Sequence, residues 1–112
     1  MNDLQKKLEC ERLVNEGFSY KSNGDFDEAI IKYREALEFV PETERIRFEG
    51  REDYHENADE IRSEICNFIM NAYQDLVNKT YFEALKYNPN NYRVRTDTLH
   101  MANFYLSRYL NT

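Results

Sequence analysis

Apolar residues recur at helical spacing in two short stretches near the start of the chain. In the second stretch, polar residues separate the apolar positions Phe26, Ala29, Ile30, Tyr33, Ala36, Leu37 and Val40. Spacings of three and four residues place such side chains on one face of an α-helix. Pro41 then ends the stretch. The pattern predicts two helices, over about residues 4–22 and 26–40.

The segment Asn23-Gly24-Asp25 separates these two helices. Gly24 can adopt the left-handed conformation that ends a helix. Asp25 and Glu28 form a pair like a capping box at the start of the next helix. Because a short connection makes consecutive helices antiparallel neighbours, we expect the chain to begin with an antiparallel helix pair.

These spacings resemble the tetratricopeptide repeat, whose pattern has a large apolar residue, Leu, Gly, Tyr, Ala, an aromatic residue, Ala and Pro at set intervals. The corresponding residues here are Leu13, Glu16, Gly17, Tyr20, Ala29, Tyr33, Ala36 and Pro41. Only Glu16 departs in chemical type. The resemblance covers residues 9–41 and implies an all-α fold of antiparallel helix pairs, in which small residues at positions 17 and 29 allow a close helix crossing.

Residues 42–57 are dense in charge and contain Gly50. We interpret this segment as a charged linker or a solvated helical extension. It resembles the long charged insert after the first helix pair in tetratricopeptide domains of immunophilin-type co-chaperones.

The stretch 58–88 is similar to a second, degenerate repeat that has lost its turn. Tyr73 lies 16 residues before Pro89, whereas Tyr20 lies 21 residues before Pro41. About five residues are missing, and they are those of the turn.

Two structures are possible for residues 58–88. Either a tight turn remains near residues 75–80, or the two helices fuse into one of about 30 residues. Apolar pairs recur every four residues, and each such step overshoots a full turn by about 40°, so the apolar stripe winds around the helix. This winding favours a fused helix that packs against a second subunit, in a homodimer with packed or exchanged helices.

The last apolar stretch predicts a C-terminal capping helix over residues 91–111, and the whole chain, residues 1–112, is expected to form a single helical domain. Hydrophobic residues make up 41% and charged residues 32% of the chain, as in folded soluble proteins. The net charge of −6 and the short basic clusters disfavour binding to nucleic acid. No apolar run approaches the roughly 20 residues of a membrane span, and no signal-peptide core is present. We therefore expect a cytoplasmic protein that does not bind membranes.

Candidate chemistry is sparse. Cys10 and Cys66 lack metal-ligand spacing and are expected to be reduced and structural. Asp97 and His100 form a lone pair, and His55 lies in the charged segment, where we expect it to be solvated. Because no phosphate-binding loop, metal cluster or nucleophile motif is present, we predict a non-catalytic protein with no catalytic residues, no metal site and no cofactor.

The resemblance implies that a protein or peptide partner binds in a concave groove lined by the first helix of each pair. The groove positions are Glu11, Val14, Phe18 and Lys21 in the first repeat and Glu64, Asn67, Asn71 and Gln74 in the second. We predict partner binding by Val14, Phe18, Lys21, Asn67, Asn71, Gln74 and Arg93. Phe18 is either an exposed anchor or buried against the long helix. Asn67 and Asn71 either hydrogen-bond an extended peptide or are solvated.

Relatives that bind the acidic tails of heat-shock chaperones use a five-residue carboxylate clamp. The positions of that clamp fall here on Val14, Phe18, Phe68, Arg93 and Asp97, of which only Arg93 has the required chemistry. We expect an adaptor or co-chaperone-like module that does not bind these tails through the clamp. The alternative is a structural homodimer of long helices with no open groove.

Overall fold

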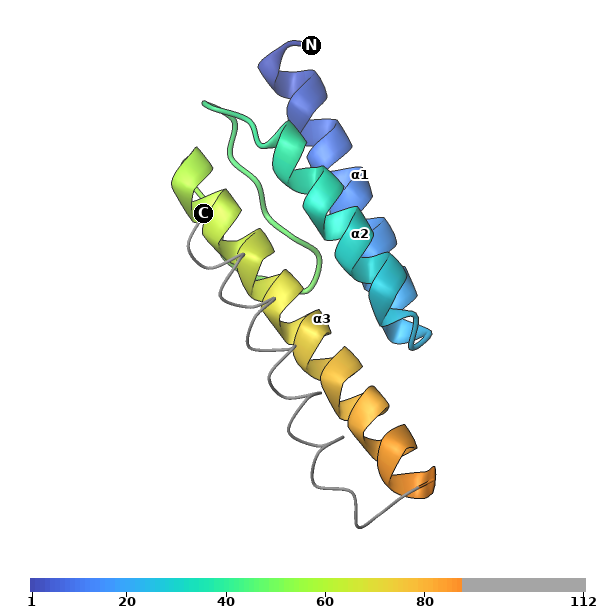
Figure 1. Ribbon diagram of the computed structural model, residues 1–112. Coiled ribbons are helices and arrows are strands. Elements are labelled where there is room, and N and C mark those ends of the chain that lie inside the picture. The colour runs from blue at the N-terminus through green and yellow to red at the C-terminus, as the bar shows by residue number, and fades with distance from the viewer. Residues whose placement is uncertain (88–112) are drawn as a thin grey trace.

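The computed structural model describes residues 1–87, which form three α-helices and one 3-10 turn. Helix α1 spans Asp3–Ser22, α2 spans Phe26–Ala36 and is followed by η1 (Leu37–Phe39), and α3 spans Ala58–Tyr87. α1 and α2 lie side by side and antiparallel, and α3 runs along them (Figure 1). The predicted all-α fold is confirmed, and the predicted helix over residues 91–111 lies outside the described residues.

The turn between α1 and α2 forms at the predicted residues. Gly24 has a φ of +81°, which is the left-handed conformation that glycine adopts without strain. Asp25 is the N-cap of α2, but its side chain makes no capping hydrogen bond, so the predicted capping box with Glu28 is wrong. Its ψ of 68° lies outside the extended range that aims an N-cap side chain at the first turn. A capping box forms instead at the start of α1, between Asn2 and Gln5.

Close packing between Gly17 and Tyr33 holds the first helix pair together. Tyr33 is fully buried, and a Cβ atom at position 17 would lie 2.7 Å from Cδ1 of its ring. Only glycine leaves room for the aromatic ring at this crossing. Leu13 and Ala29 are buried beside it, as the spacing predicts.

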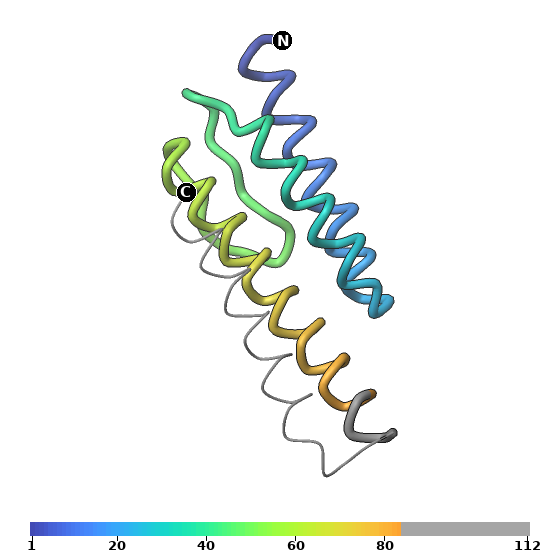
Figure 2. Tube along the Cα trace, in the orientation of Figure 1, coloured from blue at the N-terminus to red at the C-terminus, as the bar shows by residue number. Residues whose placement is uncertain are grey.

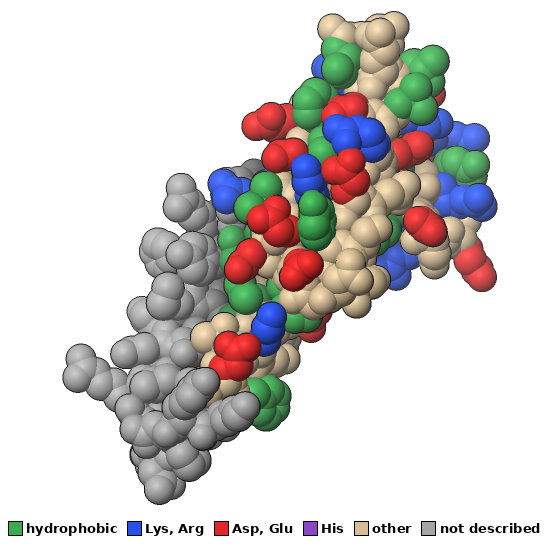
Figure 3. Space-filling view, turned by 90° about the vertical axis from the view of Figure 1, so that its right-hand side faces the viewer, with side chains coloured by type: hydrophobic (Ala, Val, Ile, Leu, Met, Phe, Trp, Pro, Cys, Tyr) green, Lys and Arg blue, Asp and Glu red, His purple; other side chains and the backbone are tan. Residues whose placement is uncertain are grey.

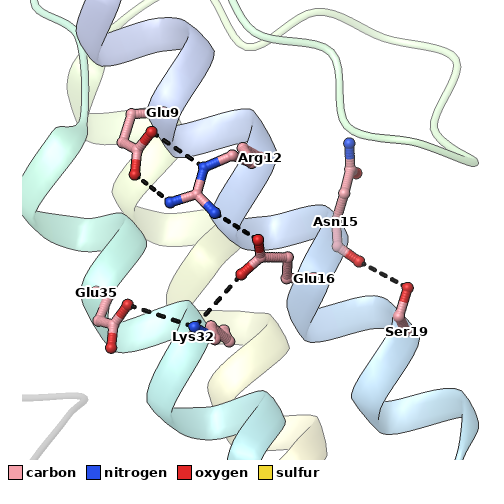
Figure 4. Close-up of polar contacts among 7 residues, drawn as sticks. All are labelled: Glu9, Arg12, Asn15, Glu16, Ser19, Lys32 and Glu35. Carbon is pink, nitrogen blue, oxygen red and sulfur yellow. Dashed lines mark hydrogen bonds and ion pairs between the residues drawn. The ribbon is translucent and has the colours of Figure 1, made fainter.

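Glu16, the one residue that departs from the repeat pattern, bridges the two helices on their outer face (Figure 4). Its carboxylate pairs with Arg12 on α1 and lies 3.4 Å from Nζ of Lys32 on α2. Arg12 also pairs with Glu9, and Lys32 with Glu35 at 3.9 Å. The hydrogen bond to Glu16 is the main cause that raises the pKa of Lys32. An ion pair therefore links α1 and α2 where the repeat pattern has an apolar residue.

Helix α3 is continuous over 30 residues, which confirms the fused helix and excludes a turn near residues 75–80. Lys79 donates a hydrogen bond from Nζ to the carbonyl oxygen of Gly24 at 3.4 Å. This contact places Lys79 beside the turn between α1 and α2. The rest of α3 continues beyond the end of the helix pair (Figure 1).

The inserted segment, residues 42–57, forms no helix, so the predicted solvated helical extension is wrong. The segment links η1 to α3 but is not fully solvated. Ile46 and Phe48 are only 0% and 2% exposed and belong to the core, while the residues on either side of each are exposed. Ile46 and His55 exchange backbone hydrogen bonds of 3.2 and 2.7 Å, and the ring of His55 lies 5.6 Å from that of Phe48. Strand-like alternation thus buries two apolar residues of a highly charged segment.

Candidate interaction surface

The inserted segment runs between the helix pair and α3 (Figure 2). Its residues contact α1 and α3, and we call the surface that these two helices present to it the face formed by α1 and α3. The segment begins at the first turn of α1, where the carboxylate of Asp3 accepts backbone hydrogen bonds from Glu42, Thr43 and Glu44 at 2.6, 2.8 and 2.9 Å. The hydroxyl group of Thr43 donates a further bond of 2.7 Å. These bonds, that of the Thr43 side chain first, lower the pKa of Asp3 from 3.8 to about 2.

The middle of the inserted segment contacts α3 through an aromatic ring and a guanidinium group. The ring of Phe48 lies 5.3 Å from that of Phe68, which in turn lies 5.0 Å from that of Phe18 on α1. The guanidinium group of Arg51 lies 5.6 Å from the Phe68 ring, and its Nε lies 3.4 Å from the carboxylate of Glu64. The middle of the inserted segment therefore packs against α3, and Phe18 of α1 contacts the same Phe68 ring.

The α1 residues predicted for the groove are largely covered. Val14 is 0% exposed, so its predicted place on an open groove is wrong: it lies in the core. Phe18 is half-buried, and its ring lies against those of Tyr33 and Phe68. Of the two alternatives for Phe18, the structure therefore favours burial against the long helix over an exposed anchor. Nζ of Lys21 lies 3.8 Å from the carboxylate of Asp75 on α3, so this ion pair joins the two helices.

The α3 residues predicted for the groove are mostly exposed. Asn67, Asn71 and Gln74 lie at the surface, at spacings that place them on one helix face. The Glu64 side chain, only 18% exposed, is occupied by Arg51. The structure therefore brings three amide side chains together, while Arg93 lies outside the described residues.

A cleft of about 440 Å³ lies between α1 and the inserted segment. Glu11 and Asn15 form its α1 wall, and residues 47–51 form the other. The repeat pattern did not indicate Asn15 or the inserted segment as parts of the surface. The alternation of Ile46 and Phe48 with charged residues was the one signal in the sequence that could have found this wall.

Basic side chains gather on the outer side of the inserted segment. The guanidinium groups of Arg45 and Arg47 lie 4.8 and 5.5 Å from the centre of the Tyr54 ring. Figure 3 shows Lys and Arg side chains gathered at one edge of the upper half of the molecule. Arg45 also pairs with Glu56 at 3.3 Å, so part of this positive charge is balanced locally.

Reactive groups and metal ligands do not gather among residues 1–87. Both cysteines are free, as predicted, and burial raises the pKa of the Cys10 thiol to about 12 and also raises that of Cys66. Both thiols are therefore protonated near neutral pH. The described part of the chain contains no group of three potential metal ligands, and none of its helices is both long and apolar enough to cross a membrane.

The architecture defines a class: an all-α protein that begins with an antiparallel helix pair closed by a glycine turn. Residues 10–43 match the family model described as Tetratricopeptide repeat. The match supports a tetratricopeptide repeat in the first helix pair and covers less than a third of the chain. No curated protein and no solved structure matches the chain.

Proposed function

We propose that this protein is a non-catalytic adaptor that binds an extended segment of a protein partner along the face formed by α1 and α3. Tetratricopeptide repeats are protein-interaction modules, and the match at residues 10–43 supports the same role here. The observation that carries the proposal is the inserted segment itself. It lies against this face in extended form with Ile46 and Phe48 buried, so the face has the shape and apolar character to receive a polypeptide.

The exposed amides on α3 supply the polar contacts that an extended backbone needs. An amide side chain both donates and accepts hydrogen bonds, so Asn67, Asn71 and Gln74 can pair with successive peptide groups of a partner. Asn15 on α1 is exposed at the cleft and can do the same. Phe18 and Lys21 line this face more deeply.

Selection from a random peptide library tests the proposal. The purified protein is expected to select peptides with a common sequence pattern. Asn71→Arg should weaken their binding at least tenfold because it puts a bulky charge in the amide row. Glu28→Arg, a charge change at an exposed position of α2, is the control and should leave binding unchanged. Peptides without a common pattern, or equal binding to Asn71→Arg, would contradict the proposal.

The adaptor is co-chaperone-like in architecture but lacks the carboxylate clamp. Val14 and Phe68, at two of the clamp positions, are apolar and buried in the core. An acidic chaperone-tail peptide should therefore show no measurable affinity in calorimetry. The free thiols at Cys10 and Cys66 suit a reducing compartment such as the cytoplasm.

A homodimer through α3 is the second candidate. α3 continues past the helix pair (Figure 1), and Phe82 on this part of the helix is 66% exposed. A partner copy would bury such an aromatic side chain. The mass in solution at micromolar concentration separates the candidates, since a monomer argues for an open face. Inserting Gly-Asp after Leu76 should convert an exchanged dimer to monomer, and an unchanged mass would exclude exchange.

A further inference from the structure

The inserted segment resembles a bound peptide more than a connecting loop. From Arg45 to Glu49, side chains point alternately inward and outward, and the two inward ones, Ile46 and Phe48, are almost completely buried. The backbone of Ile46 pairs only with His55 of the same segment. Residues 46–51 thus contact α3 through their side chains, as a separate extended peptide would, whereas the backbone N–H groups of residues 42–44 anchor the start of the segment to Asp3.

A third contact follows three residues after Phe48. The guanidinium group of Arg51 lies over the Phe68 ring at 5.6 Å and beside the Glu64 carboxylate at 3.4 Å. Glu64 is largely shielded from water, so this charge pair is screened less than an open surface pair. Gly50, with a φ of +80°, provides the bend that brings Arg51 back to α3.

These contacts define a sequence pattern: two large apolar residues separated by one residue, then a basic residue three positions further on. From this pattern we infer that the α1–α3 face is a binding site for extended peptides of this kind, and that residues 45–51 occupy it as a resident ligand that a partner must displace. This inference rests on the proposed function and names both the ligand class and its regulation. A basic motif also suits the charge of the protein, which is −6 overall.

Displacement is controlled by the covalent tether. Because a tethered segment competes at an effective concentration in the millimolar range, a free peptide of equal intrinsic affinity binds the intact protein poorly. Lifting residues 45–51 from this face removes Phe48 and Arg51 from the Phe68 ring and uncovers that ring for a partner. The inserted segment is thereby an autoinhibitory contact.

A labelled synthetic peptide of residues 43–52 tests this inference against two proteins, wild type and the double variant Ile46→Ser/Phe48→Ser. Fluorescence anisotropy should show at least tenfold tighter binding to the double variant, whose own segment no longer fits the groove. A control peptide with serine at the same two positions should bind neither protein. If the double variant is folded by circular dichroism and binds the peptide no better than wild type, the inference is overturned.

An unfolded double variant also gives a decisive result. The peptide should then restore its helical circular dichroism, while the serine control should not, and failure of the peptide to restore helix overturns the inference. Charge exchange adds a specific check. Glu64→Arg, made in the double variant, should weaken binding several-fold and recover it with a peptide carrying glutamate at position 51.

The two functional tests can fail separately. Suppose that library peptides bind the wild type and Asn71→Arg weakens that binding, while the peptide of residues 43–52 neither binds the double variant nor restores its helix. The proposed function would then stand, and the inference of a resident ligand would be overturned.

Discussion

The molecule buries its apolar residues in different ways in two regions. One is the first helix pair, and the other is formed by the inserted segment and α3. In the pair, a glycine turn folds the chain back so that α1 and α2 cover one another, with Tyr33 seated on Gly17. The second region contains no such turn between helices, and α3 is continuous for 30 residues. Its apolar face is covered partly by an extended segment through Phe48. An extended segment, rather than a helix folded back by a turn, therefore contributes Ile46 and Phe48 to the core.

Substitution of a buried residue in the inserted segment should have the largest effect on stability. If the segment is as much a part of the core as the helices, Ile46→Ala should lower the free energy of unfolding by about 2–5 kcal/mol, as large-to-small changes at buried sites do. Ile31→Ala, at an exposed position of α2, should change it by less than about 0.5 kcal/mol. Chemical denaturation monitored by circular dichroism measures both, and equal small effects would show the segment to be a passive linker.

Gly17→Ala tests the first helix pair. The new Cβ atom would collide with the ring of Tyr33, whose other neighbours Phe18 and Phe68 lie with ring centroids 5.9 and 5.8 Å away and leave it little room to move. Overpacking of about 1–3 kcal/mol should outweigh the gain of about 0.5–1 kcal/mol from replacing glycine in a helix.

Ser19→Ala, on an exposed position of the same helix, is the matched control for this change. It adds no atoms to the crossing and should leave stability unchanged or slightly raised. A rise in the melting temperature of Gly17→Ala would mean that α1 and α2 can separate without loss, and that the crossing does not set the geometry of the pair.

Local signals in the sequence predicted the fold because they act through short-range geometry. Gly24 specified a left-handed turn, and the shortened distance from Tyr73 to Pro89 indicated the fused α3. The capping box at Asp25 failed because a side-chain hydrogen bond depends on a backbone angle that residue type alone does not fix.

The candidate surface was harder to predict because it depends on contacts between distant residues. Val14 was assigned to an open groove from its repeat position, but its side chain is fully buried in the core. Asp3 accepts hydrogen bonds from residues about 40 positions away in the sequence. Acidic residues are common in the first turn of a helix, so its residue type and position do not indicate these bonds. The exposed positions of Asn67 and Asn71 were implied by the repeat resemblance, with Tyr73 aligned to Tyr20.

Tyr33→Phe tests the core where the two regions meet. Unlike the substitutions above, it should raise the free energy of unfolding. Among the described residues, the hydroxyl group of Tyr33 has no hydrogen-bond partner, and burial raises its pKa to about 12. A buried polar group without a partner costs about 1–3 kcal/mol, so its removal should raise the free energy of unfolding by about 1 kcal/mol. Tyr54→Phe, at an exposed ring, should have no effect on the denaturation midpoint. Destabilisation by Tyr33→Phe would reveal a partner for the hydroxyl.

Asp3→Asn concerns the bonds that join the two regions and should have the smallest effect. The pKa of Asp3 is about 2 in the folded protein and 3.8 in an unperturbed chain, chiefly through the bond from Thr43. A carboxylate with a depressed pKa stabilises the fold above its unfolded pKa, and this contribution is lost as the pH falls toward the folded value. The difference in denaturation midpoint between wild type and Asp3→Asn should therefore be present at pH 5–7 and disappear between about pH 4 and pH 2. Asp53→Asn, at an exposed position of the inserted segment, is the control and should show no such pH-dependent difference. If the difference for Asp3→Asn persists at pH 2, the ionised carboxylate is not what holds the inserted segment to α1.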